Sequence, residues 1–140
     1  MVPLGLPNQA EQTPASPFDA EAMALLNHLR FVAMACRSKP RADLFEACAL
    51  LQVTRSATQE AHADALMRCL REALGQQPKL HAPGTLETSF DEAWLMQLGI
   101  ACATKNEASI AFLLRSRVAP ENRRLVRYLM THVSERFSLN

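Results

Sequence analysis

The pattern of apolar and polar residues centres on one apolar run, residues 93–103, in which Gln97 is the only polar residue. Ser89 precedes this run and Glu92 follows Ser89 by three residues, which is the spacing of a capping box at a helix start. A helix that is apolar on nearly all sides has to be covered on most of them. The pattern therefore predicts that residues 89–105 form the central helix of the core.

Five other segments have helical periodicity and begin at residues that favour helix starts. In the first half of the chain, one expected helix is opened by Ser16 and Pro17 and runs to about Arg37, and a second runs from about Arg41 to Gln52 after Pro40. A third is capped by Thr54 or Ser56 and ends at Leu74, before Gly75. In the second half, Asn106 caps a helix from Glu107 to Val118, and the last helix starts at Pro120. Few glycines with abundant alanine and leucine also favour helix. The sequence thus predicts an all-α fold of about six helices.

The expected helices fall into two halves, separated by a long connection at residues 75–88 that holds two prolines and two glycines. Each half opens with a Phe-Asp pair, and each ends with a longer helix that contains a similar motif, LMRCL from Leu66 or LVRYL from Leu125. These similarities indicate an internal repeat or a chance match between sequences rich in Ala, Leu and Arg. If the repeat is real, the helical bundle consists of two related three-helix halves whose apolar first helices pair at the centre.

Length and composition are those of an ordinary globular protein. The 140 residues are enough for a single helical domain, expected at 17–140, after a disordered tail at residues 1–16 that carries three of the eight prolines. The net charge of +1 gives no general attraction to nucleic acid or to an acidic membrane. No apolar run is long enough to span a bilayer, and no N-terminal signal is recognised, so the expected location is cytoplasmic. The four cysteines are expected to be buried, reduced thiols.

The sequence contains no motif that indicates catalysis or a cofactor. A Gly-rich phosphate loop, GxSxG and HExxH are all missing from it. His62 and Cys69 are seven residues apart and His28 and Cys36 are eight apart, whereas zinc ligands on a helix are typically three or four apart. We therefore expect a non-catalytic protein with no metal and no cofactor, in which these side chains belong to the core or to helix caps.

Residues 44–66 resemble a DNA-binding helix-turn-helix. In this resemblance Leu50, Leu51 and Val53 pack between the two helices, and Thr54 caps the recognition helix. The residues that would face the DNA groove are Arg55, Ser56 and Gln59. The same helix carries two acidic residues, although phosphate contacts require Lys or Arg. A DNA-binding transcription regulator is therefore the alternative function, and an ordinary corner between two helices is the structural interpretation.

Residues 94–122 resemble a tetratricopeptide helix pair. Trp94 and Leu98-Gly99 correspond to the first helix of that repeat, and Ala108, Phe112 and Pro120-Glu121-Asn122 correspond to its second helix and the junction that follows. The resemblance implies that small residues permit close packing of the two helices and that Phe112 fills the space between them. One copy is visible, which indicates a helical hairpin.

Arginine is concentrated near the C-terminus. Residues 111–140 contain six Arg and two acidic residues, whereas residues 1–36 contain one Arg and three acidic residues. Five of these arginines surround the Pro120 turn: Arg115, Arg117, Arg123, Arg124 and Arg127. They form either a solvated helix face or a docking surface for an acidic partner, because Arg is favoured at protein interfaces.

The expected function is accordingly that of a non-catalytic, helical protein–protein interaction or regulatory module. The favoured partner is another protein with an acidic surface, and nucleic acid is the second candidate. A membrane partner is not expected, and the sequence leaves the oligomeric state open.

Overall fold

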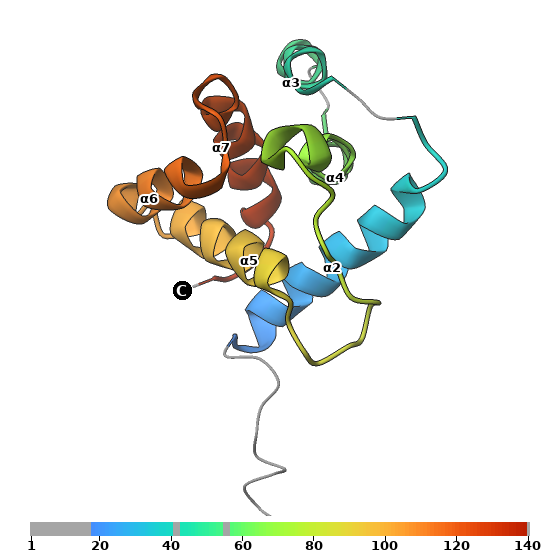
Figure 1. The fold of residues 1–140 in the computed structure, drawn as a ribbon, viewed down its shortest axis with the longest axis vertical. Coiled ribbons are helices and arrows are strands. Elements are labelled where there is room, and N and C mark those ends of the chain that lie inside the picture. The colour runs from blue at the N-terminus through green and yellow to red at the C-terminus, as the bar shows by residue number, and fades with distance from the viewer. Residues whose placement is uncertain (1–17, 41–42, 55–56, 140) are drawn as a thin grey trace, which may run out of the picture.

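The protein is built from helices throughout the part of the chain that the computed structural model describes, residues 18–40, 43–54 and 57–139 (Figure 1). The six helices are α2 (Ala20–Cys36), α3 (Leu44–Val53), α4 (Gln59–Leu74), α5 (Phe90–Ala103), α6 (Glu107–Arg117) and α7 (Pro120–Ser134). No strand occurs in these three ranges. The predicted all-α class is therefore confirmed, while the predicted tail at residues 1–16 lies outside the described residues. None of the described helices is long and apolar enough to cross a membrane.

Local capping chemistry sets the end of α4 and the starts of α5, α6 and α7 as predicted. The Ser89 hydroxyl accepts the N–H of Glu92 at 3.1 Å, and the Glu92 carboxylate accepts the N–H of Ser89 at 3.0 Å, which completes the capping box of α5. The Asn106 side chain caps α6, and Pro120 occupies the first turn of α7. Gly75 ends α4 with a φ of 79°, a left-handed conformation that glycine adopts without a steric penalty.

The start of α2 was predicted too early. Ser16 and Pro17, the expected start, lie outside the described residues. Asp19 has an extended backbone, and its carboxylate accepts the N–H of Ala22 at 2.9 Å. Asp19 is therefore the N-cap, because a residue with this backbone conformation cannot lie inside a helix.

The starts of α3 and α4 were also predicted too early, for the same reason. The Asp43 carboxylate caps α3, so Pro40 is not part of that helix. The Thr58 hydroxyl caps α4 in place of Thr54 or Ser56. Thr54 instead follows the last turn of α3, and its hydroxyl donates to the carbonyl of Leu50 at 2.7 Å. A side chain nearer to the helix satisfies the free N–H groups of the first turn, and the helix begins there.

The centre of the core is shared by α5 and α7. α5 is apolar nearly all round and packs against α2, α6 and α7, as predicted for the Ser89 helix. α7 contacts α3, α4, α5 and α6, and its contact with α4 is the most extensive between any two of the described helices. α4 and α7 are strongly amphipathic, so each can bury a wide apolar stripe against the other. α2 and α5 pack against each other as expected, but less extensively than α4 and α7 do, and the central pairing of the two first helices stays a prediction.

The two halves of the chain are arranged alike in some contacts and differently in others. α2 packs against α4, and α5 packs against α7 in the corresponding way. α6 packs against α5, but α3 lies away from α2 and packs against α4 and α7 instead (Figure 1). This position of α3 leaves an open groove of about 580 Å³ between α2, α3 and α4. The relation between the two halves stays a prediction.

A buried ion pair holds the connection between α4 and α5 against the core. Arg30 of α2 and Glu92 of α5 have fully buried side chains, joined by hydrogen bonds of 2.8 and 2.9 Å. The Arg30 guanidinium also donates to the carbonyls of Thr85 and Glu87, and the Glu92 carboxylate accepts the N–H of His81 at 2.7 Å. We call these two residues the Arg30–Glu92 pair. The pair fixes the connection between α4 and α5, which forms no helix.

Candidate functional site

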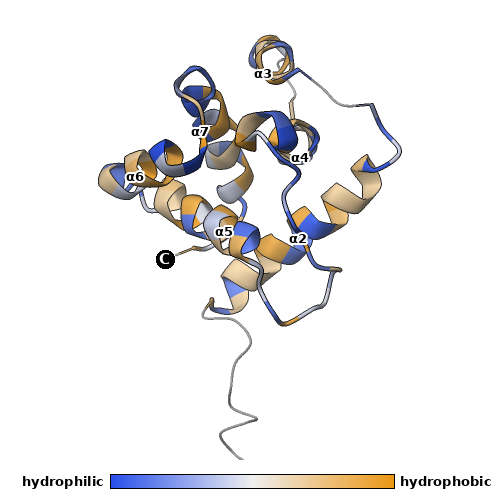
Figure 2. Cartoon of the chain, in the orientation of Figure 1, coloured by the Kyte–Doolittle hydropathy of each residue, from blue (hydrophilic) through white to orange (hydrophobic). Residues whose placement is uncertain are grey.

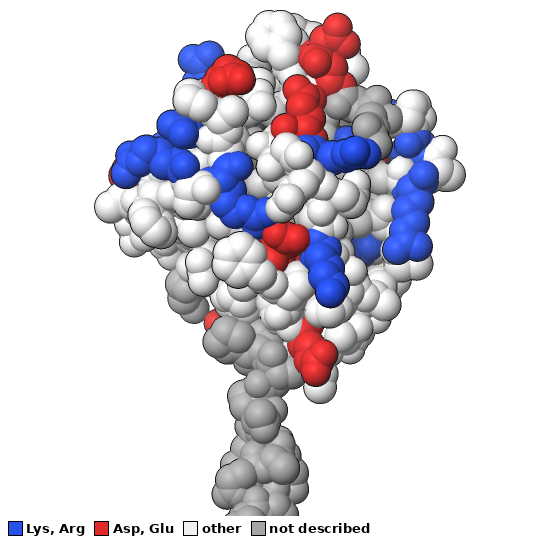
Figure 3. Space-filling model, in the orientation of Figure 1, with Lys and Arg blue, Asp and Glu red and all other residues white. Residues whose placement is uncertain are grey.

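The structure places the five arginines of the predicted docking surface on two adjacent helices, Arg115 and Arg117 on α6 and Arg123, Arg124 and Arg127 on α7. Figure 3 shows basic side chains over α6 and α7, and a second group near the end of α2 and along α4. Three of the five predicted arginines interact within the protein. Arg115 and Arg124 make no hydrogen bond or ion pair with any described residue.

The three engaged arginines have different partners. Arg117 pairs with Asp91 at 2.7 Å, and its guanidinium carbon lies 5.4 Å from the centre of the Trp94 ring. Arg123 donates to the carbonyl of Val118 at 2.7 Å. Arg127 forms a two-bond pair with the Glu107 carboxylate, at 2.8 and 2.6 Å. Because two carboxylates already neutralise part of the charge, this surface is less basic than the sequence indicates.

The structure differs in several respects from the helix-turn-helix that residues 44–66 resemble. Leu50 and Val53, expected to pack between the helices, are 65% and 76% exposed. Gln59, expected to face DNA, donates its side-chain amide to the carbonyl of Val133 at 3.1 Å. Arg55 and Ser56 lie outside the described residues. DNA binding stays a prediction, and no contact in the structure favours it.

The tetratricopeptide-like pair is likewise only partly matched. α5 and α6 do form a packed hairpin, and Trp94 is buried in it, with its indole N–H donating to the carbonyl of Leu113 at 3.0 Å. Phe112, expected between the helices, is 66% exposed. Gly99 permits a close approach of α2, since a Cβ at this position would lie 3.1 Å from Leu25 Cδ2. The small residue therefore serves the contact between α5 and α2.

The histidines and cysteines singled out in the sequence have other roles. The two ring nitrogens of His62 are within hydrogen-bond distance of the Thr58 carbonyl, at 2.7 Å, and the Tyr128 hydroxyl, at 3.3 Å. The ring stacks on His132 with centroids 4.3 Å apart. Among the described residues, no three His, Cys, Asp or Glu side chains are grouped so that they could hold a metal ion. His62 and Cys69 are both buried core residues of α4.

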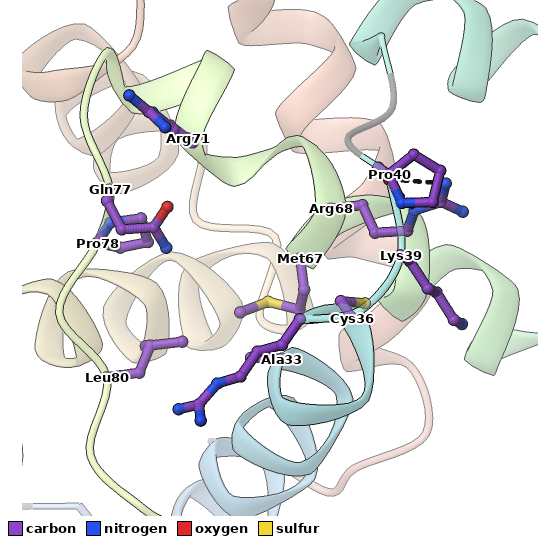
Figure 4. Close-up of a pocket in the computed structure, with 11 residues that line it drawn as sticks. Ala33, Cys36, Lys39, Pro40, Met67, Arg68, Arg71, Gln77, Pro78 and Leu80 are labelled. Atoms are coloured by element: carbon purple, nitrogen blue, oxygen red, sulfur yellow. Dashed lines mark hydrogen bonds between the residues drawn. The ribbon is translucent and has the colours of Figure 1, made fainter.

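A pocket that the sequence analysis did not predict lies where the end of α2, the middle of α4 and residues 77–80 meet (Figure 4). We call it the basic pocket; its volume is about 370 Å³, and it is lined by Ala33, Cys36, Arg37, Lys39, Pro40, Met67, Arg68, Arg71, Gln77, Pro78 and Leu80. Four of these residues are cationic and none is acidic. Figure 4 shows Cys36 and Met67 between the 77–80 segment on one side and Lys39 and Pro40 on the other.

One carboxylate beside the basic pocket holds two of its four cations. Asp64 accepts hydrogen bonds from Lys39 at 2.8 Å, from Arg68 at 3.3 Å and from the Cys36 thiol at 3.3 Å. Burial alone would raise the pKa of Asp64, but the hydrogen bonds from Lys39, Cys36 and Arg68 outweigh it and lower the pKa below its usual value. Arg68 also donates two hydrogen bonds to the Pro40 carbonyl. Arg68 is thus fixed at the rim of the pocket.

The other two cations of the basic pocket, Arg37 and Arg71, remain available to bind an anion. The side chains of Arg37 and Arg71 are exposed and form no hydrogen bond or ion pair within the described chain. Guanidinium groups bind carboxylates and phosphates through paired hydrogen bonds. The pocket therefore combines unpaired anion-binding groups with apolar surface from Ala33, Met67 and Leu80. The sequence shows that these cations lie near the end of α2 and on α4, but it does not indicate that the fold brings them together in one pocket.

The thiol in the basic pocket, Cys36, lies in an environment that disfavours its reactive thiolate form. Burial, followed by the hydrogen bond to Asp64 and its negative charge, raises the pKa of Cys36 from 9.0 to about 11. Only the thiolate reacts with iodoacetamide, and each pKa unit lowers its fraction tenfold, so at pH 8 we expect Cys36 to be alkylated roughly 100-fold more slowly than an unperturbed thiol. Mass spectrometry of the native protein during alkylation measures the rate, with the urea-unfolded protein as control. Equal rates in both states would contradict this environment.

Comparison with known proteins supplies no relative for this site. No protein-family model matches the chain, and neither do curated proteins or solved structures.

Proposed function

We propose that the protein is a non-catalytic helical interaction module that binds an acidic surface of another protein, and that it acts in the cytoplasm. The observation that supports this most is the pair of unpartnered guanidinium groups, Arg37 and Arg71, at the basic pocket. Unpaired cations gathered in a concave site repel one another, and an acidic partner converts that repulsion into attraction. The four cysteines, none of them in a disulfide, support a reducing compartment.

Exposed apolar side chains also support a role in protein binding. Large apolar side chains that are 47% to 78% exposed occur on α2, α3, α5 and α6 and in the connection before α5: Phe31, Met34, Phe45, Leu50, Val53, Leu86, Phe90 and Phe112. Figure 2 shows hydrophobic residues along much of α3. Single exposed apolar residues are common, but aromatic side chains and methionine are enriched at protein interfaces.

The arginines of α6 and α7 form a second candidate surface for the same kind of partner. Arg115 and Arg124 carry charges that no described residue neutralises, as do Arg37 and Arg71 at the basic pocket. The two surfaces can therefore be compared by removing two unpaired cations from each. Such substitutions should leave the melting temperature almost unchanged, because no ion pair is broken and exposed charges contribute little to stability.

We expect Arg37→Gln/Arg71→Gln to lose partners that the wild-type protein captures from cell extract, as measured by quantitative mass spectrometry. Glutamine has a helix propensity close to that of arginine and keeps a polar, though shorter, side chain while it removes the charge. The matched control is Arg115→Gln/Arg124→Gln, which lowers the net charge by the same amount. Loss of partners from the control alone would move the binding surface to α6 and α7.

The capture experiment can also reject the proposal. If both double variants fold and retain every partner of the wild-type protein, the unpaired arginines are solvated surface groups and an acidic partner is not recognised through either surface. Circular dichroism and melting curves of both variants establish that they are folded before the capture is compared.

A further inference from the structure

A second cavity continues the basic pocket along the same side of α2. It has a volume of about 290 Å³ and shares five lining residues with the basic pocket: Ala33, Arg37, Gln77, Pro78 and Leu80. It extends towards Met34, His81 and Ala82. Because the two cavities share these residues, they lie next to each other between α2 and residues 77–82, and we call them together the α2 groove.

The two ends of the α2 groove differ in chemistry. The end at α4 is bordered by Lys39, Arg68 and Arg71. The other end is bordered by Met34, which is half exposed, by Ala82 and His81, and by Arg30, whose charge is paired with Glu92. Arg37 lies along the shared middle part, beside the apolar side chains of the floor. A ligand that fills the groove therefore needs negative charge opposite Arg71 and Arg37 and apolar groups opposite Met67 and Leu80.

The wall of the α2 groove opposite the helix carries unused main-chain groups. The N–H of Lys79 donates to Asp91 at 2.6 Å, and the N–H of His81 donates to Glu92 at 2.7 Å. Both therefore point towards the start of α5. Leu80 lies between these two anchored residues and has its own N–H and C=O. Neither forms a hydrogen bond with any described residue.

We propose that the α2 groove binds an extended peptide segment of another protein, in which acidic side chains alternate with apolar ones. Resting on the function proposed above, this inference names the partner segment. Acidic side chains of the segment pair with Arg71 and Arg37, apolar side chains cover Met67 and Leu80, and its main chain bonds to the free groups of Leu80. Extended peptides are commonly recognised in this way, by main-chain bonds for affinity and by side-chain contacts for specificity.

The test is binding of a short fluorescein-labelled peptide in which leucine and glutamate alternate, measured by fluorescence anisotropy; we call it the leucine–glutamate peptide. We expect saturable binding that weakens as salt rises, and a loss of about tenfold or more in affinity with Arg37→Gln/Arg71→Gln. The control protein Arg115→Gln/Arg124→Gln should bind as the wild type does. A peptide with glutamine in place of glutamate, and one with serine in place of leucine, should both bind more weakly.

Three results would overturn the inference: no saturable binding of the leucine–glutamate peptide, equal binding of the glutamine peptide, or equal weakening by the two double variants. Its failure is distinguishable from that of the proposed function. If the peptide does not bind but Arg37→Gln/Arg71→Gln still loses its captured partners, the interaction is real and the partner is not an extended segment of this composition. If both experiments fail, the basic pocket is not a binding site for acidic proteins.

Discussion

Replacing Arg30 by methionine should lower the free energy of unfolding by about 3 to 5 kcal/mol, the usual loss when one partner of a buried ion pair is removed. The Glu92 carboxylate would remain fully buried without its counter-charge. The carbonyls of Thr85 and Glu87 would lose the donor that now satisfies them. Small domains are stable by only about 5 to 15 kcal/mol, so the variant should be close to unfolded in mild denaturant. Urea unfolding followed by circular dichroism measures the loss.

The double variant Arg30→Met/Glu92→Met separates the ion pair from the hydrogen bonds around it. Replacing both charges of an isolated buried pair by apolar groups is often neutral or stabilising. Here the N–H of His81 would also lose its acceptor, so we expect stability to recover only in part. A loss below about 1 kcal/mol in Arg30→Met, the range of an exposed pair, would contradict the structural role of the Arg30–Glu92 pair.

The same pair gives stability a defined dependence on pH. Burial acts to raise the pKa of Glu92, but the hydrogen bonds from Arg30 and from the N–H groups of Ser89 and His81 outweigh it and lower the pKa below 4.5. A carboxyl whose pKa is lower in the folded state binds protons more readily in the unfolded state. The stability it contributes is present above the unfolded pKa and is lost as pH falls through the folded pKa. This acid-dependent component should be smaller in Arg30→Met.

Trp94→Ala should lower the free energy of unfolding by about 3 to 5 kcal/mol, because it removes a large aromatic side chain from a packed core. Trp94 is 5% exposed and lies between α5 and α6, where its N–H bonds to the carbonyl of Leu113. The surrounding helices can collapse only partly into the space that the indole leaves. Circular dichroism is the suitable measurement, since the substitution removes the only tryptophan.

Trp94→Phe is the matched control for Trp94→Ala. It keeps most of the aromatic area and removes the N–H donor. The Leu113 carbonyl still accepts a hydrogen bond from the Ser116 hydroxyl at 2.7 Å, so no buried acceptor is left unpaired. We therefore expect a clearly smaller loss for Phe than for Ala. Native fluorescence at the wavelength of a water-exposed indole would show that Trp94 is not in the core.

Features that depend on neighbouring residues could be predicted from the sequence. The capping box of Ser89 and Glu92, the Asn106 cap and the end of α4 at Gly75 each involve residues within one helical turn, and all three are confirmed. The early starts predicted for α2, α3 and α4 have a local cause as well. Several polar residues near each start could act as the cap, and their order in the chain does not decide which one does.

Features that depend on distant residues could not be predicted in this way. Arg30 and Glu92 are 62 residues apart, and nothing in helical periodicity indicates that an arginine on α2 faces a carboxylate on α5. The basic pocket depends on the same kind of contact, since Arg37 and Arg71 meet only through the packing of α2 and α4. Phe112 is an example of a wrong prediction from a local motif. Its apolar side chain matches a buried position of the tetratricopeptide repeat, but in the structure it is exposed.

A nuclear magnetic resonance titration tests most directly whether the basic pocket is the surface that binds acidic partners. Backbone amide shifts of the isotope-labelled wild-type protein are recorded while the leucine–glutamate peptide is added. We expect the largest shift changes at Ala33, Arg37, Arg71, Gln77 and Leu80. The largest changes over residues 107–127, or changes of similar size at every exposed arginine, would contradict this expectation.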